Sequence, residues 1–563
     1  MAAQHIRSFQ TGVTRRTFLG AGVVGGAPMV AGGFGSLFSS GTAAAPEGNA
    51  IWVEKSIPQL QGLMNSGALT AIELTHGYIK RITDLNPVLR AVIELNPNAV
   101  AIAAQLDNER RLDRGPRGPL HGIPILVKDN VATNDRMQTT AGSLALVNSK
   151  VPVDAAVAAR LRAAGAIILG KANLGEWANF RGFNPFGFYG WTARGGATRN
   201  PYLLSYMAFG SSSGSCVGTA ANLCPAAVGT ETDGSIVGPS NTNLVVGLKP
   251  TLGLISQAGI VPISHEQDTA GPIGRTVTDV AILLGVLQSP FGAVVGQSPP
   301  AEYTQFLRRG AMAGKRIGVD RRFRENYDAY GFPGDSDTLP YFDQALATMA
   351  SLGATLVDTD TGDIFSYSGD EFTALLFEFK AHIEEYLASL TQTRMRTLGD
   401  LIAFNVANCP AEMLYYGQEL FEIAESTGGD LANSEYIAAR ANARNTARSG
   451  IDNALSAQNL DAIVAPHLTN TTAAAVAGYP NLALPVGITA DGKPAGMLLY
   501  SGFLKEAELI GIAYDLEQSL GVRRQPEMLG VVTDPPNAGI CGVPRPPEVF
   551  KGAAHLPHGR IFR

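Results

Sequence analysis

Cysteine is scarce in this chain, which has four in 563 residues: Cys216, Cys224, Cys409 and Cys541. Their spacing matches no metal-ligand set, so we predict neither a metal nor a metal-dependent mechanism. Cys216 and Cys224 fall in a run of small residues and are predicted to be buried thiols. The spacing alone assigns no disulfide pair.

The chain also lacks an excess of positive charge. Lys and Arg number 43 against 49 Asp and Glu, which gives a formal net charge of -6 and a pI near 5.8. A protein that binds nucleic acid needs a basic surface for the phosphate backbone, so nucleic acid is not predicted as a partner. Long hydrophobic runs are missing as well. The most apolar early stretch, Ala21 to Phe38, is short and rich in glycine, so no stable membrane span is predicted.

The N-terminal 45 residues form a segment of their own. The stretch Thr14-Arg15-Arg16-Thr17-Phe18-Leu19-Gly20 resembles a twin-arginine export signal, and Ala43-Ala44-Ala45 provides small residues for cleavage. We therefore expect residues 1–45 to be a signal peptide and the mature protein to be periplasmic or secreted. This route carries folded proteins, so export by itself does not imply disulfides.

The remaining chain has the composition of one large α/β domain. With 45% hydrophobic residues it can bury a large core. Short apolar runs such as 166–169 and 226–228 alternate with helical patterns, which indicates a mixed α/β core. We predict a catalytic domain over 50–525, with its core at about 115–290 and 455–525. Helices are predicted over 71–96, 97–112 and the substrate-entrance region at about 330–450, and residues 526–563 are predicted to be a Pro-rich, partly ordered tail.

Two clusters of serine and glycine, 210–215 and 229–235, bracket the small-residue run 216–228. Hydroxyls buried at such a place need partners, and an oriented serine is a candidate nucleophile. Upstream, Lys128 follows the apolar run Ile123 to Val127, so it either reaches solvent or is buried and neutralised. A neutral lysine is a general base near pH 7, and serine with lysine is an alternative to serine with histidine.

Three other motifs compete with this interpretation. Residues 210–214 match the nucleophile elbow of α/β-hydrolases, with Ser212 at its centre, but that site needs a histidine base. Residues 165–171 nearly match a phosphate-binding loop, yet Ala172 replaces the Ser or Thr that holds magnesium, so ATP is not predicted. A β-lactamase-like site needs Ser-x-x-Lys, a tetrapeptide that this chain lacks. The histidines available to the elbow are His265, His382, His467, His555 and His558.

From about Ser56 to about Leu520 the chain resembles the amidase signature hydrolases, and within them the bacterial peptide amidases. The resemblance implies a single α/β domain whose central mixed β-sheet is covered by helices on both faces. Several motifs carry it in the same order as in the family. They are Lys128-Asp129-Asn130, Leu169 to Arg181, Arg199-Asn200-Pro201, the two Ser/Gly clusters, Val246 to Thr251, Asp268 to Pro272 and Asn481 to Pro485.

The resemblance assigns roles residue by residue. Ser235 matches the acylated nucleophile, Ser211 the bridging serine that follows a cis peptide bond, and Lys128 the base. The reaction it implies is hydrolysis of a carboxamide through an acyl-Ser235 intermediate, without metal or cofactor. The backbone N–H groups of the turn before and at the nucleophile would bind the oxyanion. That turn comprises Thr232, Asp233, Gly234 and Ser235.

Two departures from the common family pattern narrow the substrate class. Asp233 and Val237 stand where many members have glycine and arginine, as in the peptide amidase branch. We therefore expect a peptide with a C-terminal amide, or an amino-acid amide, with Trp177, Phe180 and Asp233 as candidate contacts. The alternatives are a broad aryl or aliphatic acylamidase with esterase side activity, or a catalytically silent exported binding protein. The sequence does not predict the oligomeric state.

Overall fold

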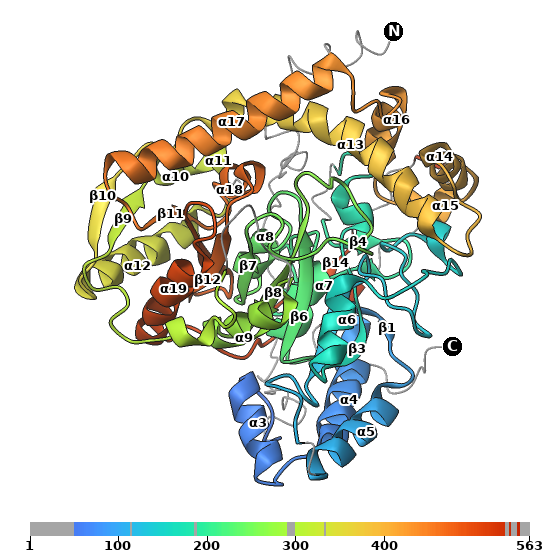
Figure 1. The fold of residues 1–563 in the computed structure, drawn as a ribbon, viewed down its shortest axis with the longest axis horizontal. Coiled ribbons are helices and arrows are strands. Elements are labelled where there is room, and N and C mark those ends of the chain that lie inside the picture. Colours follow the sequence, from blue (N-terminus) through green and yellow to red (C-terminus); the bar gives the residue numbers. More distant parts are fainter. Residues whose placement is uncertain are drawn as a thin grey trace, which may run out of the picture.

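The centre of the molecule is a mixed β-sheet (Figure 1). The computed structural model describes residues 50–112, 115–184, 189–289, 299–331, 334–534, 540–541 and 549–551. In this part of the chain, an 11-stranded sheet has the order β1-β3-β2-β6-β8-β7-β12-β13-β11-β9-β10. Its strands are β1 (Val92–Leu95), β2 (Pro124–Lys128), β3 (Ile167–Ala172), β6 (Ala226–Glu231), β7 (Val246–Lys249), β8 (Thr269–Gly274), β9 (Arg316–Val319), β10 (Thr355–Asp358), β11 (Ala462–Pro466), β12 (Asn481–Ile488) and β13 (Pro494–Tyr500).

Helices cover both faces of this sheet, as the family resemblance implies. In the β7–β8 pair, Gly247 lies close to Ser240 of α8, whereas Gly274 lies close to Asp279 of α9, so these two helices lie on opposite faces. The helices are α3 (Ile57–Asn65), α4 (Ala71–Leu89), α5 (Ala99–Arg111), α6 (Ala156–Ala163), α7 (Ser213–Ala220), α8 (Val237–Thr242), α9 (Val277–Leu287), α10 (Arg321–Glu325), α11 (Tyr327–Tyr330), α12 (Leu339–Ser351), α13 (Ser368–Ser389), α14 (Leu398–Ala407), α15 (Cys409–Glu412), α16 (Glu419–Ser426), α17 (Ser434–Ala457), α18 (Thr471–Ala477) and α19 (Glu506–Leu520).

The strands nearest the centre are buried on both faces. Every residue of β2, β3, β6, β7 and β8 is buried, which explains why these segments appear in the sequence as short continuous apolar runs. The predicted helical region between 330 and 450 is mostly helical. Its long helices α13 and α17 cross the top of the view in Figure 1 and pack against each other.

One predicted helix is shorter than expected. The helix over 71–96 ends at Leu89, and Val92–Leu95 forms β1, antiparallel to β3. The chain leaves the helix at Arg90, whose φ of 49° is left-handed, and the β-branched pair that follows favours an extended backbone. The sheet edge therefore overrides the helical periodicity of the sequence.

The C-terminal tail is tied back to the domain. Residues Val531–Thr533 (β14) pair with Val549–Lys551 (β15), and Asp534 forms an ion pair with Arg199. A disulfide joins Cys541 to Cys409 at the start of α15, a pairing that the sequence left open, whereas Cys216 and Cys224 are free, buried thiols. The predicted signal peptide, residues 1–45, lies outside the described residues. Among the described helices, none is both long and apolar enough to cross a bilayer.

Candidate active site

The predicted site residues meet at the carboxyl ends of two neighbouring parallel strands. Lys128 is the last residue of β2, and Ser235 lies in the turn that follows β6. Ser211 lies just before α7, the helix that precedes β6. Open α/β sheets bind their ligands at the carboxyl ends of strands, because loops and helix N-termini converge there.

Lys128 is fully buried and held by three oxygen atoms. Its Nζ lies 2.7 Å from Oγ of Ser211, 2.9 Å from Oγ1 of Thr230 and 3.2 Å from the carbonyl oxygen of Thr230. A neutral amine has two hydrogens and one lone pair, so it can donate to both oxygens of Thr230 and accept from the Ser211 hydroxyl. The geometry therefore accommodates an uncharged lysine as well as a charged one.

The electrostatics of the pocket shift this balance toward the uncharged form. Burial lowers the pKa of Lys128 to about 7, and the negative charges of Asp268 and Glu231 oppose this shift only in part. No carboxylate forms a salt bridge with Lys128 in the described part of the chain. A substantial fraction of the amine is thus neutral at physiological pH.

The backbone of the first Ser/Gly cluster is bent at Gly210. The Gly210–Ser211 peptide bond is cis, as the family resemblance implies for the bridging serine. A Cβ at Gly210 would lie 2.1 Å from the carbonyl oxygen of Tyr189, so only glycine fits there. The next N–H, that of Ser212, donates to the carbonyl oxygen of Ser235 at 3.1 Å. This bond holds the two serine clusters against each other.

Ser235 lies in a turn that leaves several amide groups available. Gly234 has a left-handed φ of 75°, and the buried Oε2 of Glu231 accepts the N–H groups of Ile236 and Val237 at 2.6 and 2.9 Å. In the described structure, none of the four predicted oxyanion donors, the N–H groups of Thr232, Asp233, Gly234 and Ser235, has an acceptor. Free amides grouped beside a serine hydroxyl are the donors that an oxyanion requires.

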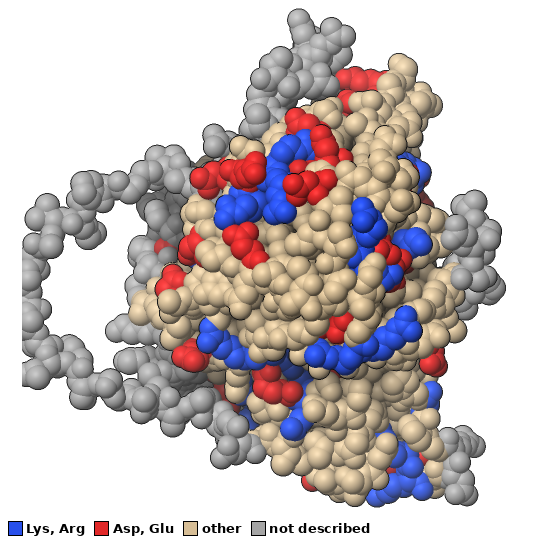
Figure 2. All heavy atoms as spheres, turned by 90° about the vertical axis from the view of Figure 1, so that its left-hand side faces the viewer, with Lys and Arg blue, Asp and Glu red and all other residues tan. Residues whose placement is uncertain are grey.

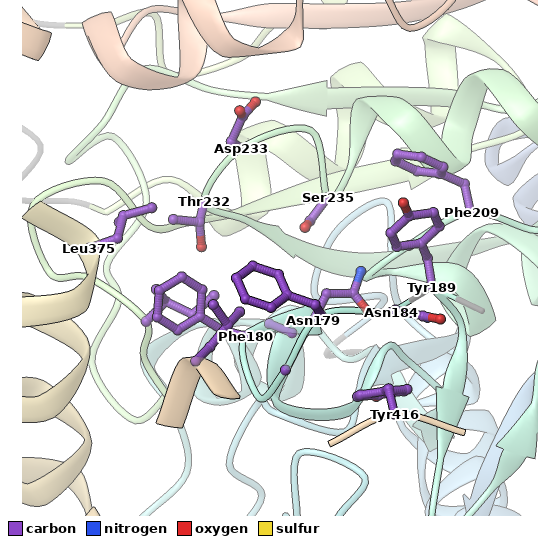
Figure 3. A pocket seen from close by; sticks show the side chains of 16 residues that line it. Asn179, Phe180, Asn184, Tyr189, Phe209, Thr232, Asp233, Ser235, Leu375 and Tyr416 are labelled. Atoms are coloured by element: carbon purple, nitrogen blue, oxygen red, sulfur yellow. The ribbon is translucent and has the colours of Figure 1, made fainter. Parts of the chain in front are cut away.

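The Ser235 hydroxyl faces a cavity of about 80 Å³ (Figure 3). Its wall is largely aromatic and apolar, with a few amide and hydroxyl groups near the serine. The lining residues are Ala178, Asn179, Phe180, Gly182, Phe183, Asn184, Tyr189, Phe209, Gly210, Thr232, Asp233, Ser235, Ile263, Leu375, Tyr416 and Leu420. The cavity can hold an apolar side chain next to a polar group that reaches Ser235.

The three candidate substrate contacts lie in different places. Phe180 lines the cavity and packs on Phe379 at a centroid distance of 5.1 Å. Asp233 also lines it, but its carboxylate points away from the Ser235 hydroxyl in Figure 3 and accepts Oγ1–H of Thr472 at 2.7 Å. Trp177 does not line the cavity; it is buried behind the wall with its ring against Phe421.

The residues of the competing nucleophile elbow have other partners. Ser212 is buried, and its Oγ donates to the carbonyl oxygen of Thr230 at 3.0 Å. This hydrogen bond attaches the turn before α7 to strand β6. His382 stacks on His265, and His467 contacts Tyr206 and Asp335. His555 and His558 lie outside the described residues. Within those residues, no histidine is hydrogen-bonded to a serine of either cluster, and no group of side chains could hold a metal ion.

One wall of the cavity is held by the buried side chain of Arg181, whose role as a buried cation was not predicted from the sequence. Arg181 is fully buried, 3.1 Å from Glu176 and 4.0 Å from Glu412, and its Nη2 donates to the carbonyl oxygen of Tyr416 at 3.3 Å. The guanidinium also lies 4.3 Å from the centroid of the Tyr416 ring. Because Tyr416 lines the cavity, this cluster fixes the loop after α15 in place.

This fold and site define a class of α/β protein in which serines and a buried lysine meet at the carboxyl edge of a mixed sheet. The chain belongs to the amidase family, whose model, "Amidase", matches residues 73–473. It is therefore an amide-hydrolysing enzyme.

Relatives and solved structures agree with this assignment. The chain is 38% identical over 498 residues to a probable amidase of Arabidopsis thaliana, covering 84% of this chain and 92% of that protein. It is similar to the crystal structure of the peptide amidase from Stenotrophomonas maltophilia, with 44% identity, a TM-score of 0.78, and coverage of 85% of this chain and 100% of that one. An amidase family protein from Bacillus anthracis matches with 32% identity, a TM-score of 0.77, and coverage of 84% and 93%.

Proposed function

We propose that this enzyme hydrolyses the terminal carboxamide of amidated peptides or amino-acid amides through a Ser235–Ser211–Lys128 triad. The observation that carries the proposal is the buried Lys128, whose Nζ lies 2.7 Å from Oγ of Ser211 with both of its other bonds made to Thr230. This arrangement leaves the lysine lone pair directed at the Ser211 hydroxyl.

The proposed reaction has two halves. Lys128 takes the proton of Ser211, which takes that of Ser235, and Oγ of Ser235 attacks the amide carbonyl carbon. The N–H groups of the turn from Thr232 to Ser235 bind the resulting oxyanion. When the C–N bond breaks, the proton returns through Ser211 to the leaving nitrogen. Water then attacks the acyl-Ser235 ester by the same relay and releases the carboxylic acid.

The cavity and the comparisons support the narrower substrate class. Phe180, Leu375 and Leu420 offer an apolar surface beside Ser235, which suits the side chain of a C-terminal residue. The 44% identity to a peptide amidase over its whole length points the same way. The aromatic lining also suits an aryl amide, which keeps a broad acylamidase as the second candidate.

A substrate panel tests this proposal directly. Purified enzyme is assayed with an amidated dipeptide, a free amino-acid amide and an anilide, and ammonia or aniline release is measured. We expect turnover of the amidated dipeptide, lost in Ser235→Ala and Lys128→Ala. Efficient cleavage of the anilide without release of ammonia from the dipeptide would favour the acylamidase. Mass spectrometry after a fluorophosphonate should find the adduct on Ser235, and an adduct on Ser212 would overturn the triad.

We also propose that the protein is exported through its twin-arginine segment. The Cys409–Cys541 disulfide supports an oxidising compartment, where such bonds persist. N-terminal sequencing of the protein from a periplasmic or culture fraction should find a start after about residue 45. Replacing Arg15 and Arg16 with lysine should retain the protein in the cytoplasm, and unchanged export of that variant would contradict the proposal.

A further inference from the structure

A buried polar network connects the outer helices to the turn that carries Ser235. Its central residue is Gln267, which is 2% exposed and lies just before β8. Gln267 Nε2 donates to the carbonyl oxygen of Thr232 at 3.1 Å and to Oε1 of Glu371 at 2.6 Å. Its Oε1 accepts from Nη1 of Arg440 at 2.7 Å. All the hydrogen-bonding groups of the Gln267 side chain are therefore engaged.

The partners of Gln267 leave its amide one orientation. Arg440 can only donate, whereas a carbonyl oxygen and a carboxylate can only accept. Rotating the amide by half a turn would place its NH₂ group against the guanidinium and its oxygen against two acceptors. The network therefore holds the Gln267 N–H on the Thr232 carbonyl.

Two helices fix the far side of this network. Arg440 of α17 donates through Nε to Oε1 of Glu378 of α13 at 2.8 Å and through Nη2 to the other carboxylate oxygen. The same carboxylate accepts the hydroxyls of Tyr436 at 2.9 Å and Ser264 at 2.6 Å. Glu378 is fully buried, so this ion pair is strong and rigid.

The Thr232 carbonyl matters because it shares a peptide plane with the N–H of Asp233. That peptide is trans, so its C=O and N–H point in opposite directions and fixing one fixes the other. The Thr232 side chain is held as well, since its Oγ1 donates to Asp268 at 2.6 Å. With the carbonyl turned toward Gln267, the N–H of Asp233 is turned away from it, and that N–H has no acceptor among the described residues.

We propose that Gln267 is a positioning residue for the oxyanion site: held by the α13–α17 ion pair, it aims the Asp233 N–H at the developing negative charge. The inference rests on the proposed function, because it presupposes acyl transfer to Ser235. Gln267 is not among the residues that line the cavity, so we expect it to act only through the direction of a donor. Removing one oxyanion donor from a serine hydrolase costs about 10²- to 10³-fold in kcat. A donor that is kept but points in the wrong direction should cost less.

The test uses Gln267→Met, which keeps the side-chain length, and Gln267→Glu, which keeps the acceptor for Arg440 but loses both donors. For an amidated peptide we expect kcat to fall about 10- to 100-fold while KM stays within about twofold. A peptide aldehyde forms a hemiacetal with an oxyanion, so its affinity should fall by a similar factor. A reduced-amide analogue, which has no carbonyl oxygen, should bind as it does to the wild type.

Gln288→Met is the matched control. Gln288 is also buried, donates to the backbone carbonyls of Pro300 and Ala301, and accepts from Tyr303, but it does not line the cavity. It should lose similar thermal stability without losing kcat. Arg440→Lys is a second test variant. It keeps the charge but loses the planar guanidinium that bonds both Glu378 and Gln267, so it should weaken aldehyde binding as the Gln267 variants do, even if Gln267→Met folds poorly.

The proposal is overturned if both Gln267 variants bind the aldehyde as tightly as the wild type, or if the loss appears in KM alone. An equal loss of kcat in Gln288→Met would also overturn it, because the effect would then be general destabilisation. Failure of the proposed function looks different. In that case Ser235→Ala keeps its amidase activity, whatever the Gln267 variants do.

Discussion

Lys128 of β2 is hydrogen-bonded to Thr230 of the adjacent parallel strand β6, and both oxygens of Thr230 lie within 3.2 Å of the lysine Nζ. The hydroxyl of Thr230 also accepts from Nδ2 of Asn130 at 2.9 Å. This pairing uses the two hydrogens of a neutral amine and leaves its lone pair for Ser211. The register of β2 against β6 therefore sets the direction of the base.

Thr230→Val should test that relationship. Loss of the hydroxyl removes one acceptor of Lys128, so the amine loses its fixed rotation. We expect kcat to fall about tenfold, less than the roughly 10²- to 10⁴-fold that a general base contributes, because the base itself is kept. Thr230→Ser should retain most of the activity. Thr75→Val, at a buried threonine of α4 that bonds its own helix, is the control and should leave kcat unchanged. Steady-state kinetics on an amidated peptide decides the outcome.

Lys128→Met should greatly slow catalysis without unfolding the protein. The wild type must keep an amine uncharged in a buried site, which costs stability at any pH below about 10.4, the pKa of an unfolded lysine, whereas methionine carries no such cost. We expect amide hydrolysis to fall by about 10²- to 10⁴-fold and the Tm at pH 7 to hold or rise. Single alanine substitutions of His265 and His382 should leave activity largely intact. A lethal histidine change with a tolerated Lys128→Met would contradict the triad.

The pH profile should show the titration of Lys128. Its pKa is lowered to about 7 by burial, and the neutral form is the base. Activity should therefore be low below pH 6, rise through pH 7 and level off above it, because the fraction of neutral amine follows that curve. Measuring kcat/KM between pH 5 and 9 checks this. A profile that is flat down to pH 5 would show that no group of this pKa acts as the base.

Gly234→Ala should separate activity from stability. Gly234 and Gly310 both have left-handed φ values, 75° and 79°, so alanine at either position should cost about 1 kcal/mol of backbone strain. A Cβ at Gly234 would also lie 3.1 Å from Oγ1 of Thr471, whereas the space around Gly310 is open. We expect similar melting temperatures for the two variants, with a large loss of kcat in Gly234→Ala only. Equal kcat values in both would contradict the role of this turn.

The Cys409–Cys541 disulfide should stabilise the mature enzyme. It connects positions 132 residues apart and pins the tail to α15. Removing such a bond typically costs about 2–4 kcal/mol, so reductant should lower the Tm of the wild type. Cys541→Ser should have the lower Tm from the start and should not respond to reductant, whereas Cys224→Ala should respond like the wild type. An unchanged wild-type Tm in reductant would show that the bond does not contribute to stability.

The local parts of this candidate site are visible in the sequence. The apolar run before Lys128, the two Ser/Gly clusters and the glycine at 234 are short-range patterns, and short-range patterns reflect backbone conformation and burial directly. The fold class followed from the alternation of apolar runs with helical segments. The edge strand β1 was missed because the same residues also fit a helix, and only pairing with β3 decides between the two.

What the sequence by itself determined is the set of side chains available for chemistry, the two serine clusters and Lys128, and a charge balance without an excess of basic residues. On the face drawn in Figure 2, acidic and basic side chains are interspersed, as that balance implies. Tertiary structure alone decided the partners. Gln267 meets Arg440 across 173 residues, and Cys409 meets Cys541 across 132. Contacts between such distant positions depend on how whole layers pack, and no local pattern in the chain encodes them.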